Sequence, residues 1–160
     1  MDKNSFIYFT KTIFLILISS FIIDKMVYLF INNLSKNVLS GQKVGKVNHY
    51  ITIKDTLDFV VFGSSRANHH INNLKINKNS FNMGMDGQKI AFHKTLIELL
   101  PRNKKQTILI NIDPDEIFNK NYTGEDINSL KHLFYENENI KKEIKNLNKD
   151  DFITYFYYSS

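Results

Sequence analysis

The first 31 residues are the most apolar part of the chain, and they constrain its architecture most strongly. The uninterrupted apolar core, residues 12–23, is 12 residues long, fewer than the roughly 20 needed to cross about 30 Å of hydrocarbon as a helix. Residues 5–30 reach that length if Lys11 snorkels toward one interface and Asp24 and Lys25 lie near the opposite headgroups. The sequence therefore predicts a transmembrane helix at the amino terminus.

This helix is predicted to be a retained signal anchor over residues 1–31. A cleaved signal peptide and a soluble amphipathic helix are the two alternatives. Cleavage is disfavoured because no small-x-small site follows the apolar run and residues 26–31 (MVYLFI) continue it. Lysines lie on both sides of the run, so the positive-inside rule does not fix the orientation.

Residues 32–55 are predicted to be a linker, and residues 56–160 a single α/β domain. The linker is polar, contains Gly41 and Gly45, and shows no sustained apolar periodicity. A chain of 160 residues is long enough for one compact domain in addition to an anchor.

Composition excludes several classes of function. The net charge is +5, but the basic residues are interleaved with asparagine and acidic residues, so no basic stripe indicates a nucleic-acid partner. The chain has no cysteine, which excludes disulfides, zinc–thiolate sites and thiol nucleophiles.

The predicted domain alternates strand-like and helix-like segments. Residues 57–62 (LDFVVF), 80–83 (SFNM) and 106–112 (QTILINI) are expected to be strands. Residues 89–101 have a broad apolar helical face, and residues 139–148 repeat isoleucine and leucine at helical spacing. This order predicts a parallel sheet with helices on its faces.

Small or polar residues follow each predicted strand directly, in segments 63–66 (GSSR), 84–88 (GMDGQ) and 113–116 (DPDE). The carboxyl ends of parallel strands share one edge of a sheet, where α/β proteins bind their ligands. The three segments are therefore expected to surround one site.

Ser65 is the candidate nucleophile of that site. A serine hydroxyl needs a nearby base and hydrogen-bond donors for the developing oxyanion. Ser65 could supply both its hydroxyl and its backbone N–H, and Gly87 could supply a second N–H because glycine allows a close backbone approach. Without further context, the Gly-Ser-Ser segment is also typical of a strand-terminating turn or a helix N-cap.

Three motifs together, FGSSRANHH, FNMGMDGQKIAF and ILINIDPDEIF, resemble the amino-terminal half of membrane-anchored bacterial SGNH (GDSL-like) hydrolases. The resemblance implies a flavodoxin-like three-layer α/β/α fold with Ser65 as nucleophile and Gly87 as the second oxyanion donor. Asn82 and Gly84 would shape the second loop and contribute weakly to substrate binding. It also implies a single-pass protein of the bacterial cytoplasmic membrane, with an extracytoplasmic domain acting on ester groups, such as O-acetyl, of cell-surface glycans.

Two departures from the family pattern lead us to expect a truncated or degenerate copy that is inactive alone. Segment 113–116 replaces the usual Gly-x-Asn-Asp. Asp115 there is a weak candidate for substrate binding and would oppose developing negative charge unless it is protonated or points away. None of the five histidines is preceded three residues earlier by the aspartate of the Asp-x-x-His motif. Missing later strands would leave an exposed edge on the sheet. The alternative is a non-catalytic, membrane-tethered module that binds carbohydrate or a partner protein.

The remaining polar candidates have weaker assignments. Arg66 is expected either to orient an anionic or sugar substrate or to pair with Asp86. His69 and its neighbour are expected to be solvated or capping rather than catalytic, because a base four residues along one helix rarely points at the hydroxyl. His93 is expected to be packed or at the surface. No metal site and no cofactor are predicted, because the histidine spacing matches no common ligand signature.

Overall fold

The computed structural model describes residues 3–147, which divide into two compact units with a boundary between Asn37 and Val38. The first unit is the helix α1 (Lys3–Lys36). The second unit contains, in chain order, α2 (Val44–Ile53), β1 (Phe59–Gly63), α3 (Ser65–His70), η1 (Asn73–Lys75), β2 (Ser80–Asn82), α4 (Ile90–Glu98), β3 (Thr107–Asn111), α5 (Pro114–Ile117), η2 (Glu125–Leu133) and α6 (Glu138–Leu147).

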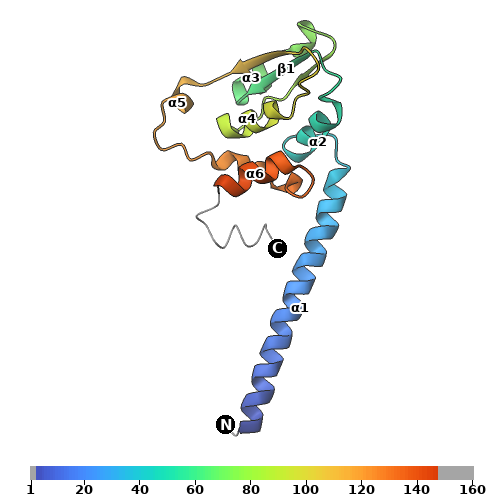
Figure 1. Cartoon of the computed structure of the whole chain (residues 1–160), viewed down its shortest axis with the longest axis vertical. Helices are drawn as coiled ribbons and strands as arrows, with labels where there is room; N and C mark the ends of the chain where they lie inside the picture. Colours follow the sequence, from blue (N-terminus) through green and yellow to red (C-terminus); the bar gives the residue numbers. More distant parts are fainter. Residues whose placement is uncertain (1–2, 148–160) are drawn as a thin grey trace. The chain divides into compact units, whose positions relative to one another are not determined.

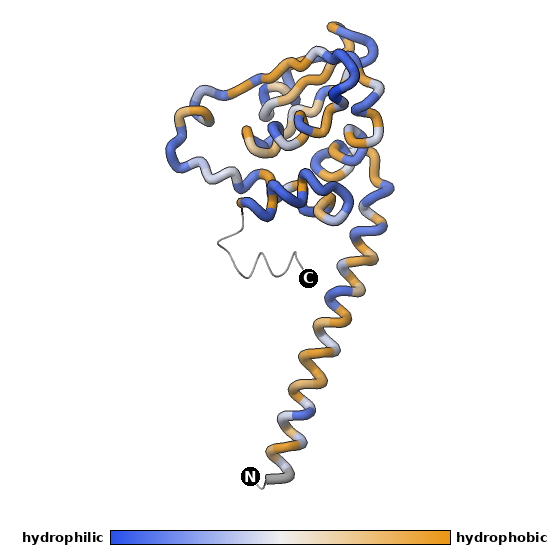
Figure 2. The backbone as a smooth tube through the Cα atoms, in the orientation of Figure 1, coloured by the Kyte–Doolittle hydropathy of each residue, from blue (hydrophilic) through white to orange (hydrophobic). Residues whose placement is uncertain are grey.

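Helix α1 is long and apolar enough to cross a membrane. Its 34 residues correspond to a length of about 51 Å at the usual rise of an α-helix, more than the hydrocarbon thickness of about 30 Å. Figure 2 shows that apolar residues dominate it, and these side chains are exposed in the isolated chain. A signal sequence satisfies the same criteria of length and composition, so the choice between anchor and signal peptide stays a prediction.

The second unit is built on a three-stranded parallel sheet of order β2-β1-β3, which confirms the predicted parallel α/β arrangement (Figure 1). Val60 of β1 pairs with Phe81 of β2 on one side and with Ile108 of β3 on the other. All three strands lie within two residues of their predicted bounds. The finer assignment to a flavodoxin-like fold stays a prediction.

Both faces of β1 are buried, because successive side chains of a strand point to opposite faces of the sheet. Val60 and Phe62 join the main core with residues of α2, α4, η2 and α6. Phe59 and Val61 form a smaller cluster with Ala67 of α3. The central strand thus joins the two hydrophobic clusters of the domain.

Helix α2 occupies a segment that was predicted to be linker, so that prediction is wrong for residues 44–53, and the folded unit begins near residue 38 rather than 56. Val47 and Tyr50 are buried in the main core. The Tyr50 hydroxyl donates to the Leu96 carbonyl at 2.9 Å. Gly45 is a residue of this helix, packed so closely on the Ser40 backbone that a side chain would collide with it.

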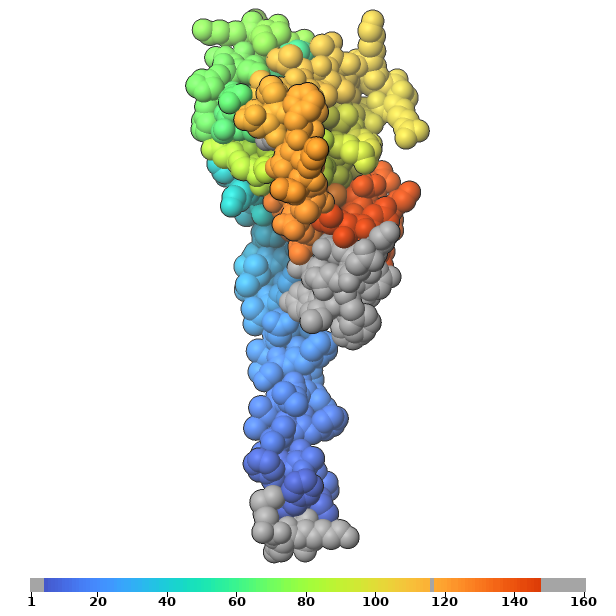
Figure 3. Space-filling view, turned by 90° about the vertical axis from the view of Figure 1, so that its left-hand side faces the viewer, coloured from blue at the N-terminus to red at the C-terminus, as the bar shows by residue number. Residues whose placement is uncertain are grey.

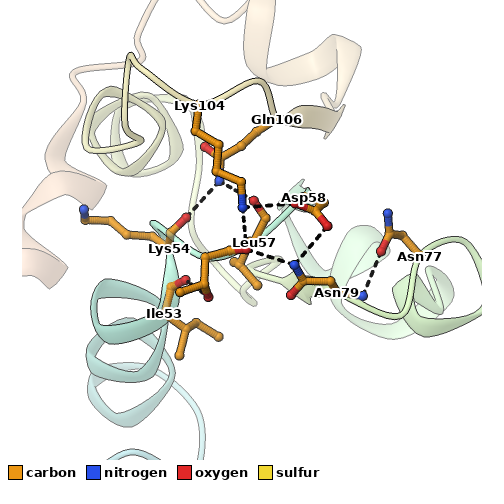
Figure 4. Close-up of polar contacts among 9 residues, drawn as sticks. Ile53, Lys54, Leu57, Asp58, Asn77, Asn79, Lys104 and Gln106 are labelled. Carbon is orange, nitrogen blue, oxygen red and sulfur yellow. Dashed lines mark hydrogen bonds and ion pairs between the residues drawn. The ribbon is translucent and has the colours of Figure 1, made fainter.

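Side-chain amides tie the end of α2 to the starts of the strands (Figure 4). Gln106 Nε2, just before β3, donates to the carbonyls of Lys54 at 2.8 Å and Leu57 at 2.7 Å. Asn79, just before β2, donates to the Asp58 carboxylate at 3.0 Å. The two Gln106 bonds satisfy backbone carbonyls that neither helix nor sheet pairs, and they hold the end of α2 at the amino-terminal edge of the sheet.

The contribution of α2 can be tested with Tyr50→Ala and the matched substitution Thr52→Ala on the exposed side of the same helix. Tyr50→Ala is expected to lower the free energy of unfolding by about 3–5 kcal/mol, because it leaves a cavity in the core. Thr52→Ala is expected to change it by less than about 0.5 kcal/mol. Urea unfolding of the full chain in detergent, followed by proteolysis of the domain, measures both. Equal effects would mean that α2 does not belong to the core.

Candidate functional site

Ser65 lies where the sequence predicted, immediately beyond the central strand. β1 ends at Gly63, and Ser65 is the first residue of α3. The Ser65 side chain is exposed, whereas Ser64 is partly buried at the N-cap position of α3. The Ser64 side chain makes no capping hydrogen bond, so helix capping does not account for the serine pair.

Gly63 is required at the end of β1 for two reasons. Its φ of 141° lies in a region that L side chains rarely adopt. A Cβ at this position would lie 2.5 Å from the Asn111 carbonyl oxygen and 2.9 Å from the Ala67 Cβ. The missing side chain therefore lets β3 and α3 approach the same point from two sides, and this close approach positions Ser65.

The three polar segments do meet at one edge, as predicted. Arg66 Nη1 lies 3.3 Å from Asp113 Oδ2, which joins the segment after β1 to the segment after β3. His69 Nε2 lies 2.9 Å from Asp86 Oδ2, which joins α3 to the loop after β2. The predicted alternative pair of Arg66 with Asp86 is wrong, because His69 and Asn68 occupy that carboxylate.

Lys46 of α2 also reaches this edge, and sequence reasoning missed it because it assigned Lys46 to the linker. Its Nζ donates to Asn68 Oδ1 at 2.7 Å and to the Gly84 carbonyl at 2.5 Å. Burial lowers the pKa of Lys46, and the charge of Asp86 partly opposes that shift. The only signal in the sequence was the helical spacing of its apolar neighbours, Val47 and Tyr50.

Asp86 links these groups into one network. Asn68 Nδ2 donates to one carboxylate oxygen at 2.9 Å, and His69 contacts the other. Both hydrogen bonds lower the pKa of Asp86, and the bond with His69 has the larger effect. The Asp86 carboxylate therefore joins α3 to the loop after β2 through its hydrogen bonds with Asn68 and His69.

Asn82 and Gly84 hold the second loop in place. Asn82 Nδ2 donates to the carbonyls of Ala67 at 2.8 Å and Ile71 at 2.9 Å, while its Oδ1 accepts from the Gly84 N–H at 2.9 Å. A Cβ on Gly84 would lie 2.6 Å from the Asn68 nitrogen. Both residues shape the loop, as the family resemblance implies. Both hydrogens of the Asn82 amide are used within the protein, and the contribution of the two residues to substrate binding stays a prediction.

Gly87 is exposed in the loop after β2 and has a φ of 73°. No atom lies within 4 Å of the position that a Cβ would take, so its backbone conformation, and not lack of space, favours glycine there. An open backbone of this kind is what the predicted oxyanion donor requires.

The segment after β3 lies at the surface of the domain (Figure 3). Asp113 Oδ1 accepts from the Asp115 N–H at 3.3 Å and thereby caps the short helix α5. The Asp115 side chain is exposed. Asp113 therefore serves as both a helix cap and the partner of Arg66, where the family pattern would place residues of the oxyanion hole.

No general base accompanies Ser65 within residues 3–147. None of the five histidines hydrogen-bonds to its hydroxyl in the described part of the chain, and His69 is paired with Asp86. The same residues contain no group of three or more histidine, aspartate or glutamate side chains placed to hold a metal ion. Within residues 3–147, the Ser65 hydroxyl is therefore exposed at this edge without a histidine hydrogen-bonded to it.

Comparisons with protein-family models, with curated proteins and with solved structures give no match for this chain. The resemblance to SGNH hydrolases therefore rests on the three sequence motifs and on their order along the chain. The structure brings all three motifs to one edge of a parallel sheet.

His93 of α4 is buried, which agrees with the first of its two predicted environments, packed or at the surface. It is 5% exposed, and its ring packs edge-on against Phe62 and Phe92. Neither ring nitrogen has a hydrogen-bond partner of good geometry among the described residues. Burial lowers the pKa of His93 to about 4, although the charge of Asp126 partly opposes the shift.

This shift predicts a stability that depends on pH. The unfolded chain binds a proton at His93 below about pH 6.5, whereas the folded chain binds it only near pH 4, so stability falls as the pH is lowered through this window. The loss at pH 4 relative to pH 7 is expected to be roughly 3 kcal/mol. His93→Gln should remove this part of the pH dependence, and His70→Gln on the exposed end of α3 should retain it. Urea unfolding at both pH values measures the difference, and identical profiles for the two variants would contradict the assignment.

Proposed function

We propose that the domain carries the nucleophile and oxyanion side of an SGNH-like serine esterase or acyltransferase site. Ser65 is the nucleophile, and the backbone N–H groups of Ser65 and Gly87 are the oxyanion donors. The substrates are ester groups, such as O-acetyl, on cell-surface glycans. The proposed reaction uses no cofactor, and the proposal includes no nucleic-acid partner.

The observation that carries the proposal is the position of Ser65. It is exposed at the carboxyl end of the central strand, on the edge to which the loops of β2 and β3 also come. A hydroxyl at this position can attack an acyl carbonyl that enters from solvent. The resulting tetrahedral oxyanion needs donors fixed in advance, which rigid backbone N–H groups provide.

The proposed location is the bacterial cytoplasmic membrane. A single pass of α1 would hold the domain on the extracytoplasmic side, next to surface glycans. The length and composition of α1 support a membrane span. The side of the membrane rests on the family resemblance alone.

A second candidate is a non-catalytic, membrane-tethered module that binds carbohydrate or a partner protein. The pairing of side chains at this edge favours the binding module over the esterase, because Arg66, His69 and Asp86 all pair with other side chains of the domain. In this case Ser65 would be an ordinary surface hydroxyl.

A fluorophosphonate probe separates the two candidates. It forms a covalent bond to an activated serine oxygen and releases fluoride, and imidazole added to the solution can supply the missing base. The full chain in detergent is expected to be labelled at Ser65 when imidazole is present, with the adduct located by peptide mass mapping. The expected preference over the adjacent Ser64 is at least tenfold.

Two variants control this experiment. Ser65→Ala should abolish the adduct, and Ser64→Ala should leave it unchanged, because Ser64 is partly buried whereas Ser65 is exposed. Labelling that is equal at both serines, or absent at Ser65 at every imidazole concentration, would contradict the esterase proposal and favour the binding module.

A further inference from the structure

The outer edge of β3 is an exposed apolar surface of the described domain. β1 pairs with the inner side of β3, and no strand among residues 3–147 pairs with its outer side. The apolar side chains along it are 39% exposed at Ile108, 38% at Leu109, 45% at Ile110 and 46% at Ile112. An uncovered edge of this kind is a template for pairing with another strand.

The backbone of β3 presents hydrogen-bonding groups along the same edge. The Thr107 N–H donates to the Asp58 carbonyl at 2.9 Å, and the strand then pairs with β1 in parallel register. Because successive residues of a strand bond in alternate directions, Leu109 also bonds toward β1. The N–H and C=O groups of Ile108 and Ile110 therefore point away from the sheet, where another strand can pair with them.

The sequence of this edge is complementary to itself when two copies run antiparallel. Residues 105–113 read KQTILINID, with a lysine at one end, an aspartate at the other and apolar residues in the middle. Antiparallel pairing centred on Leu109 brings apolar residues together in the middle and opposite charges together at both ends. The pairs between one copy and the other are Leu109 with Leu109, Ile108 with Ile110, Thr107 with Asn111, Gln106 with Ile112 and Lys105 with Asp113.

This register matches the two copies better than its neighbours do. Residues whose backbone groups point outward must lie opposite one another, so the alternative centres are the adjacent residues of the strand. A centre at Ile108 would place Lys105 opposite Asn111 and leave its charge without a partner. A centre at Ile110 would place Gln106 opposite Pro114, which has no N–H to donate.

The charges at the two ends of the edge can reach a second copy. Lys105 is exposed at the start of the edge, and Asp113 is partly exposed at its end. Directly opposed residues of an antiparallel pair have Cβ atoms about 5 Å apart, which allows an ion pair between lysine and aspartate. Asp113 also contacts Arg66, the residue after Ser65. The partner's Lys105 would therefore add a cation beside the edge that carries Ser65.

The groove between α4 and β3 extends the apolar surface. It has a volume of about 340 Å³ and is lined mainly by isoleucine side chains of the two elements, including Ile110 of β3. Side chains two residues apart in a strand share one face, so Ile108 lies on the same face as Ile110. In the antiparallel pair, the partner's Ile108 lies opposite Ile110 on this face and extends the apolar contact beside the groove.

We propose that two copies of the domain pair antiparallel through the outer edges of β3, about a two-fold axis at Leu109. The two three-stranded sheets form one sheet of six strands, in which the outward backbone groups of Ile108 and Ile110 bond across the axis. Both copies use the same surface, so the contact closes at two copies. Anchoring of both copies in one membrane by α1 would raise their local concentration. The pairing does not depend on Ser65 being a nucleophile.

A single cysteine tests the position of the axis, since the chain has no cysteine of its own. In this register the two copies of residue 109 face each other with Cα atoms about 4.5 Å apart, which suits a disulfide. Leu109→Cys is expected to form an intermolecular disulfide at least tenfold faster than Leu74→Cys, an exposed position on η1, which contacts β2 at the opposite edge of the sheet. Oxidation of the full chain in detergent micelles by copper phenanthroline, followed by non-reducing electrophoresis, measures both rates.

A second position tests the direction of the strands. Thr107→Cys alone is expected to cross-link slowly, because antiparallel pairing about Leu109 separates its two copies by four residues along the strand, about 14 Å. A mixture of Thr107→Cys chains with Asn111→Cys chains should cross-link quickly, because these two residues lie opposite each other. Equal rates for Thr107→Cys and Leu109→Cys, or a rate for Leu109→Cys no higher than that for Leu74→Cys, would contradict the proposal.

Charge reversal tests the ends of the interface without any cysteine. Lys105→Glu places like charges opposite each other at both ends and is expected to raise the dissociation constant of the dimer at least tenfold. Lys78→Glu makes the same change of charge at an exposed position before β2 and should leave the constant unchanged. Sedimentation velocity of the full chain in micelles measures both. A chain that stays monomeric at every concentration, or a dimer that responds equally to both variants because α1 alone joins the copies, would overturn the proposal.

Discussion

The rest of the domain depends on the burial of β1. Its five residues are all buried, and it pairs with both other strands of the described sheet. The side chains of one face join the core with α2 and α4, and those of the other face pack on α3. Because β1 fixes both neighbours, its carboxyl end fixes where three polar segments meet. At this end the missing Cβ of Gly63 allows Asn111 and Ala67 to approach.

Local patterns in the sequence predicted most of the domain's elements. Three short apolar runs, each followed by polar or small residues, predicted the three strands and the edge on which their loops gather. The apolar spacing over residues 89–101 and 139–148 predicted α4 and α6. These predictions succeeded because burial imposes a period of two on strands and of 3.6 on helices.

Other features depend on contacts between residues far apart in the chain. Helix α2 was hidden because Gly45 and its polar neighbours are typical of a loop, while Val47 and Tyr50 face a core that forms only when the sheet is present. The pair of Arg66 with Asp113 depends on the order of the strands, which single residues do not reveal. For the same reason Lys46 could not be placed beside Gly84 from the sequence.

The central claim is that Ser65 and Gly87 belong to one site at the carboxyl edge of the sheet. The most direct measurement is an NMR titration of the full chain in micelles with ethyl methylphosphonate, a monoanion that mimics a tetrahedral acyl intermediate. The account predicts that the amide resonances of Ser65 and Gly87 shift together and fit one dissociation constant, and that Ser65→Ala weakens the binding. Shifts confined to another surface, or shifts of Ser65 without Gly87, would contradict it.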